Sequence, residues 1–153
     1  MDILRKTLTG LAVLAVAVAV PPKISAADAA AVAYFSHTEV DAAFAKSGIL
    51  IGGEAGKGNY KVLTAHRDHP GEAEIHNLDT DIIYVVSGTA TFVTGGNAVA
   101  AKTTEPNELR GKSIQGGTVR HLTKGDVIII PPGIPHWFSE VPGRFLYFVV
   151  KVR

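Results

Sequence analysis

The sequence contains no cysteine, and this absence excludes several kinds of site at once. Disulfide bonds, thiolate metal sites, cysteine nucleophiles and the lipid anchor of lipoproteins all require that residue. Neither charge sign dominates, since 15 Lys and Arg residues stand against 14 Asp and Glu residues. Because there is no basic run, we do not expect nucleic-acid binding. The G-x-S-x-G elbow of serine hydrolases is also missing.

The one pronounced apolar run, residues 11–20, is too short for a membrane span of about 20 residues. Arg5 and Lys6 precede it, and small residues lead up to Ala27. This order predicts a secretory signal peptide over residues 1–27, with an uncleaved anchor as the alternative. Cleavage would remove three basic residues and one acidic residue, changing the formal net charge from +1 to −1. We therefore expect a periplasmic or secreted protein without a stable membrane anchor.

Residues 28–47 are expected to form an N-terminal extension with one short helix. Thr38 is a suitable N-cap, and Val40, Ala43 and Phe44 would share one face of the helix. We expect this helix to lie outside the barrel that the following residues would form.

From residue 48 onward the pattern changes to short β-type runs separated by Gly, Pro, Asn and Asp, which is typical of a sandwich or barrel. An all-β domain is therefore predicted over residues 48–153. The expected strands are 49–51, 60–66, 73–76, 81–87, 89–94, 113–122, 126–130, 136–140 and 145–150. The segment 95–117 is too long for a plain hairpin. It is expected to hold an extra hairpin, a lid over the barrel mouth, or an exposed loop.

The first of two matched segments contains His76, followed by Asp81 after four intervening residues and by Gly88 after six more. This spacing resembles the first signature motif of the cupin superfamily, G-x5-H-x-H-x3,4-E-x6-G. The segment departs from the motif in three ways. Glu74 stands at the first His position, Asp81 replaces Glu, and the initial Gly is missing.

The second segment places Gly125, Pro131, Gly133 and His136 at the spacing of the second cupin motif, G-x5-P-x-G-x2-H-x3-N. Glu140 stands where the motif has Asn. The resemblance covers residues 60–150 and implies a double-stranded β-helix, the cupin jelly-roll barrel, with the short helix added at its N-terminus.

The resemblance also implies a metal site formed by Glu74, His76, Asp81 and His136. Glu74 and His76 are two residues apart, so on a strand they would project to the same face. Two neutral imidazoles and two carboxylates would neutralise a divalent cation, and nitrogen and oxygen donors suit Fe, Mn, Ni or Zn. The alternative is a metal-free barrel in which Glu74 and Asp81 bond to His76, Arg67 or the backbone.

Two residues at the end of the strand 60–66 are candidates for substrate binding. His66 would enter the cavity if its strand neighbours the first motif, although a histidine in a surface turn is the simpler interpretation. Arg67 would hold an anionic substrate, as would Lys102, Arg110 and Lys112, unless these are solvated charges.

The resemblance implies that the protein binds a small molecule, because this is what the barrel of the family does. An enzyme of dioxygenase, isomerase or lyase type, acting on a small polar, oxygen-rich molecule, is one expectation. A non-catalytic barrel that binds a sugar or an organic acid is the other. Cupins often form dimers, so a homodimer is expected.

Overall fold

The computed structural model describes residues 32–51 and 58–153, and within them it contains one helix and thirteen strands. In chain order they are α1 (His37–Lys46), β1 (Ile49–Ile51), β2 (Tyr60–Arg67), β3 (Ala73–His76), β4 (Thr80–Ser87), β5 (Thr89–Thr94), β6 (Asn97–Val99), β7 (Lys102–Glu105), β8 (Glu108–Gly111), β9 (Ser113–Gln115), β10 (Thr118–Thr123), β11 (Val127–Ile130), β12 (His136–Glu140) and β13 (Phe145–Val152). The predicted signal peptide lies outside the described residues. In the part that the structure describes, no helix has the length and apolar character needed to cross a membrane.

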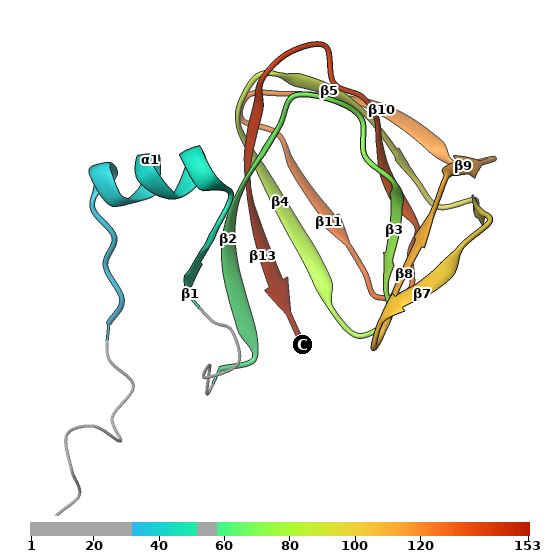
Figure 1. Cartoon of the computed structure of the whole chain (residues 1–153), viewed down its shortest axis with the longest axis horizontal. Helices are drawn as coiled ribbons and strands as arrows, with labels where there is room; N and C mark the ends of the chain where they lie inside the picture. The colour runs from blue at the N-terminus through green and yellow to red at the C-terminus, as the bar shows by residue number, and fades with distance from the viewer. Residues whose placement is uncertain (1–31, 52–57) are drawn as a thin grey trace, which may run out of the picture. The chain divides into compact units, whose positions relative to one another are not determined.

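Two antiparallel sheets face each other and form the body of the fold (Figure 1). The first has the order β1-β2-β13-β4-β11, and the second has the order β10-β5-β12-β3-β8-β7. Strands that are neighbours in space come from distant parts of the sequence, as with β13 between β2 and β4. This is the jelly-roll barrel expected from the two motifs.

The core between the sheets is aromatic at its centre. Phe92, Phe138, Phe145 and Tyr147 are all buried there, and the Phe138 ring lies 4.5 Å from Phe92 and 5.1 Å from Tyr147 between centroids. Gly88 joins β4 to β5 with φ +81°, and a Cβ there would collide with the backbone of Arg144. The glycine that ends the first motif is therefore required by this close turn.

The helix begins two residues earlier than the sequence predicted. Ser36, not Thr38, is the N-cap, because Ser36 and Glu39 form a reciprocal capping box. Phe44 is buried against Phe148 of β13, with ring centroids 5.0 Å apart. As expected, α1 lies on the outside of the sheet (Figure 1).

The segment 95–117 contains strands in place of a lid. Strands β6 and β9 pair with each other, β7 pairs with β8, and β8 continues the second sheet beside β3. The single strand predicted over 113–122 is wrong. It is divided into β9 and β10 at Gly116, whose φ of +71° is incompatible with an extended strand.

Candidate metal centre

The turn between β11 and β12 ties the two motifs together. Gly133, with φ +77°, donates its backbone N–H to the carbonyl oxygen of His76 at 2.8 Å. Three residues later, His136 lies opposite Glu74 in the pairing of β12 with β3. These contacts bring side chains from both motifs to the same inner face of the second sheet.

Glu74, His76 and His136 offer ligand atoms that all lie within 4.8 Å of one another. The two histidines are nearly inaccessible, at 7% and 5% exposure, and their rings are 5.2 Å apart. His76 Nε2 lies 3.6 Å from Glu74 Oε2 and 3.5 Å from Asp81 Oδ2. These separations exceed a good hydrogen bond. They are close to the distance of about 3.4 Å between two donors on a tetrahedral ion whose bonds are near 2.1 Å.

His136 is held in the form that a metal requires. Its Nδ1 lies 3.1 Å from the carbonyl oxygen of Ile134, which can only accept a hydrogen bond. Nδ1 therefore carries the proton, and Nε2 presents its lone pair to the cavity. Burial lowers the pKa of His136, outweighing the opposite effects of Ile134, Asp81 and Glu74. The ring is thus neutral near pH 7.

Glu74 is ionised despite its partial burial. Burial alone would raise the pKa of this carboxyl group, but the contact with His76 and the charges of Arg110 and Arg67 outweigh it. The resulting pKa is about 2. Arg110 donates to Glu74 Oε1 at 3.1 Å, and Arg67 lies 3.5 Å from the same oxygen. Oε2 is the carboxylate oxygen directed toward His76.

Asp81, the fourth predicted ligand, has two sets of neighbours. Its Oδ2 lies 3.5 Å from His76 Nε2 and 3.8 Å from His136 Nε2. Lys151 of β13, which is paired with Asp81 in register, donates to both carboxylate oxygens at 2.8 Å and 2.9 Å. Asp81 therefore lies at the centre as predicted, but it is bonded to Lys151, which was not among the predicted site residues.

Strand β8 adds two charged residues to the centre. Both belong to the segment 95–117, for which the sequence left a hairpin, a lid and an exposed loop open. Glu108 and Arg110 are two residues apart, and they pair in register with His76 and Glu74. Glu108 Oε2 lies 3.7 Å from His76 Nδ1, and Arg110 Nε donates to Glu108 Oε1 at 2.8 Å. Their alternate spacing was a possible strand signal, but nothing in the sequence indicated that this strand would lie beside β3.

His66 and Arg67 have opposite orientations because they are adjacent on β2. Arg67 lines the cavity, donates to the hydroxyl of Tyr147 at 2.9 Å and lies over the Phe138 ring. His66 does not line the cavity. Its Nδ1 lies 2.9 Å from both the hydroxyl oxygen of Ser47 and the carbonyl oxygen of Phe44, on the side of α1. The expectation that His66 enters the cavity is therefore wrong, and His66 lies within β2 and not in a surface turn.

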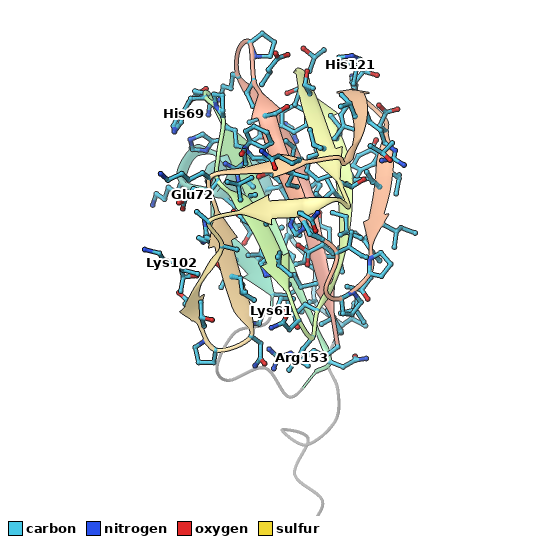
Figure 2. All side chains as sticks on the ribbon, turned by 90° about the vertical axis from the view of Figure 1, so that its right-hand side faces the viewer. Lys61, His69, Glu72, Lys102, His121 and Arg153 are labelled. Carbon is cyan, nitrogen blue, oxygen red and sulfur yellow. The ribbon has the colours of Figure 1, made fainter. Side chains whose placement is uncertain are left out.

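Of the other basic candidates, one lines the cavity and another lies on the surface. Arg110 lines the cavity, whereas Lys102 is exposed on β7 and projects from the surface (Figure 2). His121 lies at the end of the molecule opposite Lys61 and Arg153 (Figure 2). It is hydrogen-bonded to Thr91 and is not part of the centre.

The centre opens into a cavity of about 320 Å³ between the two sheets. Ionisable side chains line one part, and apolar side chains, including those of Leu63, Ile83 and Val149, line another. This volume is at the small end for ligand sites.

The cupin family model matches residues 72–152, more than half of the chain. The protein is a cupin. Both motifs, all four predicted ligands and strands β3 to β13 lie within the matched range. A search of curated proteins gives no significant match.

Several solved structures are similar to this cupin at low sequence identity. An uncharacterised double-stranded β-helix protein from Klebsiella pneumoniae is 20% identical, with a TM-score of 0.49, covering 78% of this chain and 88% of its own. The DMSP lyase DddQ from Ruegeria pomeroyi is 17% identical, with a TM-score of 0.49. The match covers 69% of this chain and 45% of the lyase chain. A cupin 2 conserved barrel domain protein from Rhodopseudomonas palustris is 16% identical, with a TM-score of 0.46. The match covers 68% of this chain and 57% of the other chain. The chain thus spans about half the length of the last two proteins.

Proposed function

We propose that this cupin binds a divalent metal ion through Glu74, His76 and His136, with Asp81 beside it as a fourth donor. The observation that supports this most strongly is the meeting of two imidazoles and one ionised carboxylate within 4.8 Å in a buried cavity. The pKa directions of Glu74 and His136 favour the protonation states that a metal needs. Nitrogen and oxygen donors without thiolate suit Fe, Mn, Ni or Zn.

The proposed activity is metal-dependent chemistry of dioxygenase, isomerase or lyase type on a small oxygen-rich molecule. A bound ion would polarise an oxygen atom of that molecule or hold it in place. The residues of the chain orient the ligands and surround the molecule. Arg67 and Arg110 hold one oxygen of Glu74, while Ile134 fixes the ring of His136. The small cavity limits the size of the substrate and the access of water.

Elemental analysis of protein purified without chelator, followed by titration of metal-free protein with Fe(II), Mn(II), Ni(II) and Zn(II), tests this proposal. One ion bound per chain is the expected result. Failure to bind any of the four ions would reject a metal-dependent activity. The non-catalytic alternative, a barrel that binds a sugar or organic acid, would then be the better account.

We also propose that the protein is exported to the periplasm or beyond and works as a homodimer. Export is supported by the basic, apolar and small-residue order of residues 1–27. Dimer formation is supported by exposed apolar side chains on the outer face of the first sheet, where Tyr84, Val127 and Ile129 are 45%, 58% and 62% exposed. Strand β11, which carries two of them, is the last strand of its sheet.

A further inference from the structure

The register of the first sheet divides the cavity wall into an apolar row and a charged row. Val149 of β13 lies opposite Leu63 of β2 and Ile83 of β4. Two residues further along the same strands, Lys151 lies opposite Asp81. Inward-facing residues of neighbouring rows are about 7 Å apart along a strand. The cavity therefore changes from apolar to ionic over the length of a few carbon–carbon bonds.

The second sheet places the metal ligands and Arg110 on the opposite wall. His136, Glu74 and Arg110 form one row across β12, β3 and β8. Arg110 is the most exposed of these side chains, at 36%, so it stands at the rim. Its bonds to Glu74 and Glu108 use two of its five N–H groups. The others can bind an arriving acceptor.

The formal charges of the cavity wall favour a single negative charge on the ligand. Four carboxylates and three basic side chains line the cavity, leaving −1 when both histidines are neutral. The lining residues counted here are Arg67, Glu72, Glu74, Asp81, Glu108, Arg110 and Lys151. A divalent ion changes this sum to +1, which one monoanion neutralises. A dianion would leave an uncompensated buried charge, which is costly.

We propose that the ligand of this cavity is a small monocarboxylate with an apolar part of a few carbon atoms. Its carboxylate faces the metal ion and Arg110, and its apolar part lies on the row of Leu63, Ile83 and Val149. The inference rests on the proposed metal site, and it narrows the substrate from any oxygen-rich molecule to an amphipathic acid. A polyhydroxylated sugar fits poorly, because its hydroxyl groups would lose hydrogen bonds to water against the apolar row.

Calorimetric titration of the zinc-loaded protein with acetate, butanoate, hexanoate and hexanamide tests the two halves of the proposal. Each added methylene should tighten binding about fourfold until the apolar row is covered. Hexanamide, which keeps the chain and loses the charge, should bind at least tenfold more weakly than hexanoate. Equal binding of the amide, or affinity that does not increase with chain length, would overturn the inference.

Matched variants distinguish the loss of contacts with the apolar row from general effects on the fold. Val149→Thr changes the polarity of the row at nearly constant volume, so hexanoate should lose about fivefold in affinity and acetate less than twofold. Val119→Thr makes the same change on β10, where the valine is 57% exposed and does not line the cavity, and should have no effect. An equal loss of hexanoate affinity in both variants would count against binding on the row.

Zinc titration in the absence of any carboxylic acid tests the metal site separately from the proposed monocarboxylate ligand. Zinc binding without any binding of acid would retain the metal site and overturn the inference. Metal-free protein should bind hexanoate at least tenfold more weakly, because the formal charge of the cavity is then −1. If none of Fe(II), Mn(II), Ni(II) and Zn(II) binds, the proposed function fails. Titration of the metal-free protein with the same acids then decides the inference, which fails if hexanoate binds no better than acetate.

Discussion

Lys151 Nζ lies 2.8 Å and 2.9 Å from the two carboxylate oxygens of Asp81, the residue at the family's carboxylate position. The same carboxylate stands 3.5 Å and 3.8 Å from the Nε2 atoms of His76 and His136. Asp81 is almost fully buried, so it needs a positive partner. A lysine ammonium and a metal ion are therefore competing partners for one carboxylate.

Replacement of that lysine, Lys151→Met, should tighten zinc binding at least tenfold, because Asp81 becomes free to join the ligands. Without metal, the same variant should be less stable by about 3 kcal/mol, since a buried carboxylate loses its partner. Zinc titration and urea unfolding measure the two effects. Lys61→Met is the control, because Lys61 is paired with Lys151 in register but is exposed. Unchanged or weaker zinc binding in Lys151→Met would show that the lysine does not compete.

Loss of either imidazole should abolish most of the metal affinity. His76→Ala and His136→Ala each remove one direct bond, and even changes behind the ligands cost about 10- to 100-fold. We therefore expect at least a 100-fold loss of zinc affinity. The fluorescence of Trp137, which donates to the carbonyl of Gly71 at 2.7 Å, reports whether the fold is retained. His121→Ala is the control outside the centre, and an equal loss in that variant would contradict the assignment.

The depressed pKa of Glu74 predicts a specific loss of stability in acid. The pKa is about 2 in the folded chain and near 4.5 when the chain is unfolded. The unfolded state therefore binds more protons between these values, so the contribution is complete above pH 4.5 and is lost as pH falls to about 2. Its size is about 3 kcal/mol.

Urea unfolding of metal-free protein between pH 6 and pH 3 measures the part of this contribution that is lost above pH 3. Glu74→Gln should be less dependent on pH in that range than the wild type. Glu105→Gln, at an exposed position of β7, should behave as the wild type does. The same dependence in wild type and Glu74→Gln would mean that another group is responsible.

The exposed apolar residues of β11 predict the position of a dimer contact. Light scattering at high micromolar concentration should give the mass of two chains. Ile129→Lys should give one chain, because a charge replaces an apolar side chain that is 62% exposed on an edge strand. Val119→Lys, at a position 57% exposed on β10, is the matched control. A monomeric wild type would reject the dimer.

The N-terminal pattern predicts that the exported protein begins near Asp28. Intact-mass measurement of protein recovered from the periplasm or medium gives the first residue directly. The expected mass lacks residues 1–27. A mass that includes Met1 to Ala27 would mean that the segment is not a cleaved signal peptide.

Much of the fold follows from local patterns in the sequence. Alternation of side chains along a strand is a local property, and it was sufficient to place strands such as Ala73–His76 and His136–Glu140 correctly. The spacing of the two motifs was enough to identify the family, because the turns at Gly88 and Gly133 need glycine at fixed positions. Thus the cupin barrel and the gathering of Glu74 with two histidines could be predicted.

The neighbours of those residues were decided by strand pairing between distant segments. Lys151 reaches Asp81 because β13 lies beside β4, and Arg110 reaches Glu74 because β8 lies beside β3. A shift of one residue in either register would turn these side chains to the opposite face. His66 and Arg67 show the same limit, since adjacency on β2 sends one to the helix and the other into the cavity. The sequence alone thus identified the candidate ligand residues, whereas the tertiary structure decided their charge partners, because register and sheet order depend on contacts between residues far apart in the chain.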